Sequence, residues 1–348
     1  MATEAARIRL PTGYRPNPTT ILGVVFVALI LVWLTINLAK TPDEFYGLFL
    51  IGLTNGAVYG LIALGYSLVY GILELINFAH GDVFMLGAML VATMTASFGL
   101  SGEGDLVLWL GILGMLLIAM AFCAALNTTI ELVAYRRLRG APRLAPLITA
   151  IGMSFILQNV GLVWKGSRPV SVDSILPRGE IFSIGGVAYT WNRFIVLLFT
   201  VPVMLALIWL VQRTRPGKAM RATAQDRDAA AMMGINVNQT ISFTFFIAGA
   251  LAGAAGLLFA LYTTNVHFTT GFRVGLIAFT AAVLGGIGNL PGAVLGALLI
   301  GLIESFNNGL TWATPGSDWT TSIIFAILIM ILVVRPEGLL GERTPEGG

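Results

Sequence analysis

The sequence predicts an all-α polytopic membrane protein. Of its 348 residues, 57% are hydrophobic and 11% are charged, whereas about 25% of the residues in soluble domains are charged. A helix that spans the membrane takes about 20 mostly apolar residues, and the chain contains about ten apolar segments near this length. The 41 glycines suit close packing of helices in lipid.

The apolar segments are separated by short polar loops, and several are short or interrupted by glycine. This pattern predicts broken as well as continuous helices. Residues 1–20 form a predicted N-terminal tail, residues 45–335 the main transmembrane domain and residues 336–348 a C-terminal tail. The apolar segments are residues 21–39, 45–71, 83–99, 106–135, 144–164, 194–211, 240–262, 274–288, 292–310 and 320–334.

Gly52, Gly56 and Gly60 repeat at every fourth residue of the second apolar segment. This spacing puts small residues on one stripe of a helix and predicts a surface against which another helix packs closely. General richness in glycine is the other explanation, but two consecutive G-x-x-x-G units favour a packing surface.

Most of the 20 Lys and Arg residues lie on one side of the membrane if every apolar segment crosses it. That side holds the N-terminal tail, residues 136–143, residues 212–236 and the C-terminal tail. By the positive-inside rule we expect these parts, and therefore both termini, in the cytoplasm. The positive charge then reflects membrane topology and does not indicate nucleic-acid binding.

Residues 212–236 are the longest polar interruption among the apolar segments, and they contain five cations. A run rich in Ala, Met, Arg and Gln follows Pro216-Gly217, and these residues favour helix. We expect one amphipathic helix of about four turns that ends at Gly234, where a C-cap glycine is favoured. The alternative is an ordinary basic loop, which has no need of a capped helix.

A polar cluster lies between the second and third apolar segments. Glu74 and Asn77 are three residues apart, so we expect them on one face of a helix. His80 and Asp82 flank Gly81, where we expect that helix to break. Because polar groups within a membrane are costly, a break there predicts part of a solute path. The alternative is a solvent-exposed hairpin in the cytoplasm, and the sequence favours neither.

A second interruption, which combines three glycines with an asparagine, has similar chemistry and joins two short apolar segments. Together the two interruptions resemble a weak internal repeat. Paired broken segments are typical of the helices that line a transporter path. The predicted path residues are Asn77, His80, Asp82, Gly285, Gly286, Gly288 and Asn289.

Other motifs exclude several kinds of site. The two histidines and Cys123 are far apart in the sequence and predict no metal site, and a single cysteine excludes an intrachain disulfide. Gly217-Lys218 does not belong to an ATP-binding P-loop, because Gln212 and Ala219 stand where that motif needs Gly and Ser or Thr.

Three polar residues near segment ends have ordinary explanations. We expect the long side chains of Glu131 and Glu304 to reach the membrane interface. We expect His267 to be solvated in a loop on the non-cytoplasmic side.

Four stretches of the chain carry a specific resemblance. They are GILELINFAHGDVFMLGAM at 71–89, RLAPLITAIGMSFILQN at 143–159, RATAQDRDAAAMMGIN at 221–236 and AFTAAVLGGIGNLPGAVLGALLIGLIE at 278–304. In this order they resemble the H-type permease subunit of branched-chain amino acid ABC importers. Asp228-Ala229-Ala230, with Gly234 four residues later, resembles the E-A-A-x-x-x-G pattern of importer coupling loops, with Asp in place of Glu.

This resemblance implies the fold of an ABC importer permease, in which residues 212–236 form the cytoplasmic coupling loop. It implies a multi-pass protein of the bacterial inner membrane, in contact with lipid. Its partners would be a sister permease, two cytoplasmic ATP-binding subunits and a periplasmic solute-binding protein. ATP and Mg would be used by the ATP-binding subunits, and this chain would hold no cofactor. Segment 21–39 precedes the part that resembles the family and is predicted as an extra transmembrane helix. The residues implied in coupling to the ATPase are Arg221, Gln225, Asp226, Asp228, Ala229, Ala230 and Gly234.

Two other functions are compatible with the pattern. Within the same class of importer, the solute would be urea, a short amide or another amino acid. From a different class, the chain would be a stand-alone secondary transporter or a channel. Such a protein needs a coupling-ion site of its own and has no use for a docking helix. No pattern in the sequence indicates an enzyme.

Overall fold

The computed structural model describes residues 18–74, 76–98, 105–142, 144–173, 175, 179–184 and 187–341 of the protein. Most of the predicted N-terminal tail, up to residue 17, lies outside the described residues. The same holds for Arg143 of the basic loop and for the end of the predicted C-terminal tail, residues 342–348.

Helices make up most of the described chain. Three short turns have other helical geometries: a π-helical turn at Glu131–Tyr135 and 3-10 turns at Arg136–Leu138 and Ser317–Trp319. The helices are α1 (Pro18–Lys40), α2 (Pro42–Leu73), α3 (Ala79–Phe98), α4 (Asp105–Ile130), α5 (Leu144–Lys165), α6 (Trp191–Arg213), α7 (Arg215–Gln225), α8 (Arg227–Met232), α9 (Val237–Thr263), α10 (Thr270–Gly285), α11 (Leu290–Gly309) and α12 (Thr320–Val334).

The predicted fold class, an all-α polytopic membrane protein, is confirmed. Within the described residues, nine helices are long and apolar enough to cross a membrane, and α10 is a shorter apolar helix of 16 residues. At 1.5 Å per residue, α10 is about 24 Å long, less than the roughly 30 Å of the hydrocarbon core. The apolar segments of the sequence therefore form helices. α12 reaches the length of a span together with the 3-10 turn before it, and α10 is too short to cross on its own.

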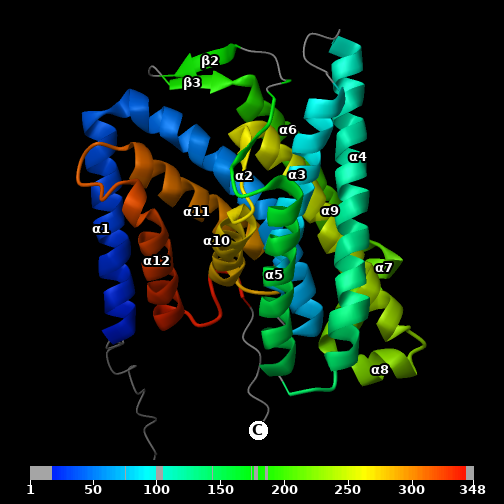
Figure 1. Ribbon diagram of the computed structural model, residues 1–348. Helices are drawn as coiled ribbons and strands as arrows, with labels where there is room; N and C mark the ends of the chain where they lie inside the picture. Colours follow the sequence, from blue (N-terminus) through cyan, green and yellow to red (C-terminus); the bar gives the residue numbers. More distant parts are fainter. Residues whose placement is uncertain are drawn as a thin grey trace, which may run out of the picture.

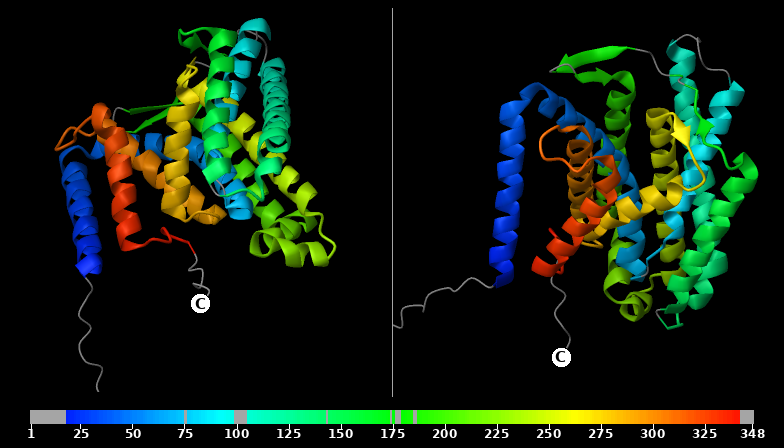
Figure 2. Two further views of the ribbon diagram at one scale, coloured as in Figure 1. Left: turned by 60° about the horizontal axis from the view of Figure 1, so that its bottom comes forward. Right: turned by 60° about the vertical axis from the view of Figure 1, so that its left-hand side comes forward.

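The helices form a bundle with two ends (Figure 1). The hairpin of β2 (Glu180–Ile184) and β3 (Val187–Thr190) covers one end, and α7 and α8 lie at the other, where the connection between α4 and α5 is also found. At one edge, α1 packs against α12, and the two further views agree (Figure 2). Few residues of α1 and α12 are buried within the chain, so this edge is available to lipid or to another subunit.

The connection between α5 and α6 contains strands that the sequence analysis missed. β1 (Val170–Ser171) pairs antiparallel with β4 (Asn265–Val266), and β2 (Glu180–Ile184) forms a hairpin with β3 (Val187–Thr190). The sequence signal was the Gly185-Gly186 pair between two short runs of strand-forming residues, a pattern typical of a hairpin. The hairpin lies against α2 and covers part of that end of the bundle.

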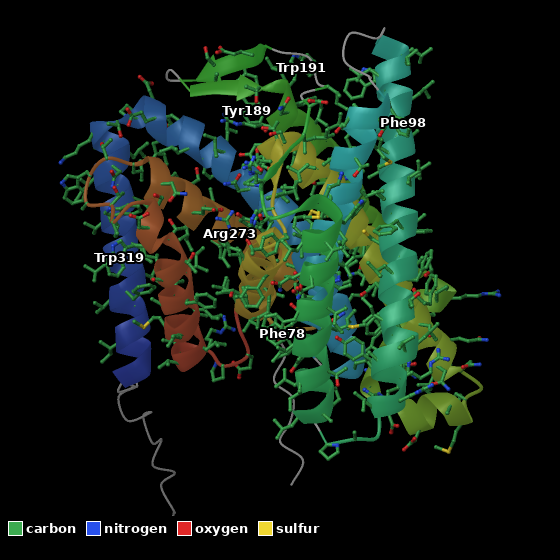
Figure 3. The ribbon with its side chains drawn as sticks, viewed as in Figure 1. Phe78, Phe98, Tyr189, Trp191, Arg273 and Trp319 are labelled. Atoms are coloured by element: carbon green, nitrogen blue, oxygen red, sulfur yellow. The ribbon has the colours of Figure 1, made fainter. Side chains whose placement is uncertain are left out.

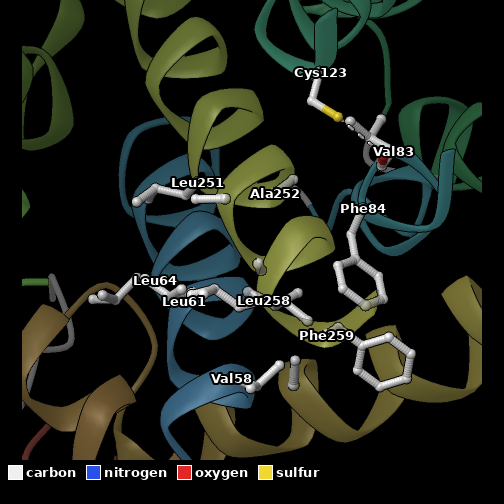
Figure 4. Packing of buried hydrophobic residues seen from close by; sticks show 14 of the residues in the cluster. Val58, Leu61, Leu64, Val83, Phe84, Cys123, Leu251, Ala252, Leu258 and Phe259 are labelled. Carbon is white, nitrogen blue, oxygen red and sulfur yellow. Dashed lines mark hydrogen bonds between the residues drawn. The ribbon is translucent and has the colours of Figure 1, made fainter. Parts of the chain in front are cut away.

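The core lies where α2, α3 and α9 meet (Figure 4). Leu64 of α2, Phe84 of α3 and Leu258 of α9 are fully or almost fully buried there. Cys123 of α4 reaches the same core, and its thiol donates a hydrogen bond to the carbonyl of Val83 at 3.4 Å. Cys123 is fully buried and serves as a small packing residue.

α2 and α11 pack with their backbones in direct contact. A Cβ atom on Gly56 would lie 2.7 Å from the Cα of Leu298, and one on Gly301 would lie 2.3 Å from the nitrogen of Gly56. Gly52 is equally close to the backbone of α11, whereas Gly60 faces a methionine side chain of α6 at 3.4 Å. The predicted packing stripe is therefore confirmed at Gly52 and Gly56, where no larger residue fits.

We predict that Gly56→Ala lowers the free energy of unfolding by about 1–3 kcal/mol, because the added methyl group overpacks the α2–α11 contact. Gly152→Ala in α5 is the matched control, since no atom lies within 4 Å of its Cβ position, and alanine favours helix there. Thermal unfolding of the purified protein in detergent measures the difference. Equal melting temperatures for the two variants would contradict the close contact.

Candidate functional site

The polar stretch between α6 and α9 folds into two short helices, so the prediction of one four-turn helix is wrong. α7 ends at Gln225 and α8 begins at Arg227, because Asp226 adopts extended backbone angles, with φ −157° and ψ 115°. Its carboxylate accepts hydrogen bonds from the N–H groups of Asp228 and Ala229, each at 2.9 Å. Asp226 is thus an N-cap, and its side chain competes with the backbone to start a new helix.

The predicted end of the loop helix at Gly234 is confirmed. Gly234 has a φ of 83°, a conformation that glycine adopts without strain. The N–H of Ile235 donates to the carbonyl of Ala230 at 3.0 Å, and the N–H of Gly234 donates to the carbonyl of Ala231 at 3.0 Å. These two bonds form a Schellman motif, which fixes where α8 ends and where the chain turns toward α9.

One face of α7 and α8 is attached to two membrane helices. The Arg221 guanidinium donates to the carbonyl of Val211 near the end of α6. Arg227 donates to the carbonyl of Ile72 at 3.0 Å, near the end of α2. Met220 of α7 is 2% exposed and packs into the core cluster. These contacts join α7 to α6 and α8 to α2.

The opposite face of this loop is exposed. Met232 and Met233 are 82% and 84% exposed, and Gln225 and Asp228 also face outward. Ala230 was expected to contact a partner, but it is only 4% exposed and packs inward. The methionine pair was not predicted from the sequence. Its signal was two adjacent large apolar residues within a polar loop, and an exposed apolar patch marks a site of interaction.

The first polar interruption is buried, but its helices are not arranged as predicted. α2 ends before Glu74, whose φ is 55°, so Glu74 and Asn77 do not share a helix face. α3 begins at Ala79, so His80 and Asp82 lie in its first turn and not beside a break. Asn77 is 3% exposed, and His80 and Asp82 are 0% exposed. These three residues are therefore not exposed to solvent, whereas Glu74 is exposed.

Each of these three buried residues has a specific neighbour. The Tyr135 hydroxyl donates to Oδ1 of Asn77 at 2.8 Å, and the Ser154 hydroxyl donates to Asp82 at 2.5 Å. The His80 ring lies edge-on to a tyrosine ring of α2, with 4.9 Å between the centroids. Together these contacts join the start of α3 to α2, to α5 and to the turn after α4.

The second interruption depends on glycine for its backbone conformation. Gly286 and Gly288 have φ angles of 109° and 87°, which disfavour other residues. Asn289 caps α11 by accepting a hydrogen bond from the N–H of Gly292 at 3.0 Å. Its side-chain amide donates to the carbonyl of Leu340 at 2.8 Å. Asn289 therefore starts α11 and anchors the segment that follows α12.

The two interruptions lie side by side at the end of α2. The N–H of Gly288 donates to the Ser67 hydroxyl at 3.1 Å, and a Cβ atom on Gly71 would lie 3.3 Å from the Cα of Gly288. Asn77 and Ile287 line one small void of about 10 Å³. The structure thus brings Asn77 together with the second interruption, whereas the histidine and aspartate of α3 pack elsewhere.

A buried ion cluster at the end of α4 was not predicted. The Glu131 side chain is fully buried and pairs with Arg139 and with Arg136, whose Nε lies 3.4 Å from it. The Ser242 hydroxyl of α9 donates to the same carboxylate at 2.7 Å. Burial lowers the pKa of the Arg139 guanidinium, and the charge of Glu131 opposes this change. The expectation that Glu131 reaches the interface is wrong, because the arginines that follow it fold back onto it.

We predict that Glu131→Ala lowers the free energy of unfolding by about 3–5 kcal/mol, because it leaves the partly buried Arg139 without its carboxylate. Asp173→Ala, at an exposed carboxylate, is the control. Denaturant titration of the purified protein measures both variants. An equal, small effect of the two substitutions would show that the ion cluster does not stabilise the fold.

Comparison with known proteins identifies the family. Residues 48–333 match the family described as "Branched-chain amino acid transport system / permease component". The chain belongs to this family. The match begins after α1, so this helix lies outside it.

Two relatives of this branched-chain amino acid permease family cover most of the chain. The high-affinity branched-chain amino acid transport system permease protein BraD of Pseudomonas aeruginosa is 40% identical over 301 residues, which are 85% of this chain and 95% of that protein. The corresponding LivH protein of Escherichia coli is 39% identical over 303 residues, with the same coverage of each chain. The resemblance inferred from the sequence is confirmed, and these relatives are permeases, not enzymes.

A solved structure titled "An inward-facing conformation of a putative metal-chelate type ABC transporter" superposes with a TM-score of 0.43 and 16% identity. The superposition covers 87% of this chain and 99% of that chain. A likeness this weak supports no conclusion about function.

Proposed function

We propose that this permease is the membrane-spanning subunit of a bacterial inner-membrane ABC importer that moves branched-chain amino acids into the cytoplasm. The family and the two relatives support the solute class. The observation that carries the mechanism is the α7–α8 pair. Arg221 and Arg227 attach one face of it to α6 and α2, and the other face is exposed.

In this proposal, ATP and Mg are held by two cytoplasmic ATP-binding subunits, one of which docks on α7 and α8 of this chain. Closure of those subunits on ATP displaces α7 and α8, and the two arginine contacts pass the displacement to α6 and α2. A sister permease and a periplasmic solute-binding protein complete the importer. The docking face consists of Gln225, Asp228, Met232 and Met233.

We place the solute path near the end of α2, where the two interruptions meet. Broken helices expose backbone N–H and C=O groups that take the place of water around a zwitterion. Within the described part of the chain, Nδ2 of Asn77 is buried and has no hydrogen-bond partner. A buried unpartnered amide costs about 1–3 kcal/mol, which favours a second state of the transport cycle in which a partner meets it.

Reconstitution into liposomes with the partner subunits tests the function. We predict ATP-dependent uptake of leucine, isoleucine and valine, and none of urea or acetamide. Arg227→Ala should lower uptake per ATP hydrolysed about tenfold, because a hydrogen bond from a charged group contributes about 1.5–3 kcal/mol. Lys218→Ala, at an exposed cation of α7, is the control. Uptake that needs neither ATP nor partners would instead identify a stand-alone transporter.

The positive-inside rule supports a topology in which both termini and α7–α8 are cytoplasmic. We predict that a membrane-impermeant thiol reagent, added outside, labels Asp173→Cys and does not label Met232→Cys. Both variants are made in a Cys123→Ala background, and both positions are exposed. Disrupting the membrane should make Met232→Cys reactive. Labelling of Met232→Cys alone in intact cells would invert the topology.

A further inference from the structure

A cavity of about 340 Å³ lies at the opposite end of the bundle from α7 and α8. It is bounded by the middle of α2, the last turns of α9 and α11, and the first turns of α10 and α12. Its volume is within the roughly 300–1,000 Å³ of small-molecule sites. In the proposed topology it lies on the periplasmic side, where a solute enters.

The cavity contains a polar network of uncommon composition for a membrane protein. Glu304 of α11 accepts a hydrogen bond from the Tyr59 hydroxyl at 2.7 Å. The Tyr262 hydroxyl of α9 donates to Oδ1 of Asn55 at 2.9 Å. Arg273, which lies in the first turn of α10 (Figure 3), lines the same cavity. The expectation that Glu304 reaches the membrane interface is wrong, because it faces this cavity instead.

The two charges in the cavity are not paired with each other. Arg273 and Glu304 both line the cavity, but no ion pair within 4.0 Å joins these two described residues. Glu304 is partly buried in a membrane-spanning helix, where a carboxylate without a close cationic partner is costly and marks a solute path, whereas Arg273 is exposed at the start of α10. Because Arg273 and Glu304 are not paired, each is free to bind the opposite charge of one ligand.

Part of the remaining wall of the cavity is apolar, and the rest carries threonine, serine and asparagine side chains. Val58 of α2, Phe259 of α9, and Val274 and Ile277 of α10 line it. A cation, an anion and an aliphatic surface around one cavity are complementary to an aliphatic amino acid, which has a carboxylate, an ammonium group and an apolar side chain. Neither urea nor a short amide has a charge for either ion to bind.

We propose that this cavity is a binding site for the zwitterionic amino acid inside the permease. Arg273 binds the α-carboxylate, for which its planar fork of donors is suited. Glu304 binds the α-ammonium group, and Tyr59 holds the Glu304 carboxylate in place. Val58 and Ile277 contact the aliphatic side chain. The inference rests on the proposed function and deepens it, since it places solute recognition in the permease as well as in the binding protein.

The assembled importer, reconstituted with its ATP-binding subunits and its solute-binding protein, provides the test. Glu304→Gln and Arg273→Gln should each lower the maximal rate of leucine uptake about tenfold, the effect of one charge-assisted hydrogen bond. The leucine concentration for half-maximal uptake should not change, because the binding protein sets it. Tyr59→Phe should have a smaller effect in the same direction. Arg168→Gln, at an exposed cation of the same end, is the matched control and should transport as the unaltered chain does.

The outcomes separate this site from the proposed function. If the unaltered importer takes up no branched-chain amino acid, the proposed function fails. If the unaltered importer takes up leucine and the Glu304→Gln and Arg273→Gln variants take it up at the same rate, the proposed binding site is wrong and the proposed function is not affected. ATP hydrolysis stimulated by the loaded binding protein should persist in both variants. Loss of uptake together with loss of assembly with the ATP-binding subunits would show that the charges are structural and would also overturn the site.

Discussion

The close contact between α2 and α11 is the constraint on which the other features depend. It is possible because Gly56 and Gly301 have no side chains to separate the two backbones. In lipid there is little hydrophobic drive between helices, so such close packing carries much of their association. α2 is thereby held in the middle of the bundle, and both interruptions and the outer cavity are built against it.

α2 also connects the two ends of the molecule. Its middle supplies Asn55 and Tyr59 to the outer cavity, and the Ile72 carbonyl at its end accepts a hydrogen bond from Arg227 of α8. The second interruption meets the same end of α2 through the Ser67 hydroxyl. A displacement of α8 therefore has a direct mechanical route to the proposed solute path and, along one helix, to the cavity at the far end.

Much of the fold could be predicted from the sequence, because hydropathy and glycine spacing act locally. The predicted apolar segments are helices in the structure, Gly52 and Gly56 form the predicted packing surface, and α8 ends at the predicted Gly234. Features that depend on distant parts of the chain could not be predicted. Glu131 is paired with arginines that fold back and with a serine of α9, and Glu304 meets a tyrosine of α2. α7 and α8 separate at Asp226 for a local reason, because its side chain caps α8. The high helix propensity of the neighbouring residues nevertheless predicted one continuous helix.

The central claim is that α8 and α2 move as one unit when ATP is bound by the partner subunits. Pulsed electron paramagnetic resonance tests it with spin labels on Met232→Cys in α8 and Tyr46→Cys at the exposed start of α2, in a Cys123→Ala background. The account predicts the same α8–α2 distance with and without ATP, while the distance from α8 to a label at the far end of an ATP-binding subunit changes. A change in the α8–α2 distance during the cycle would contradict it.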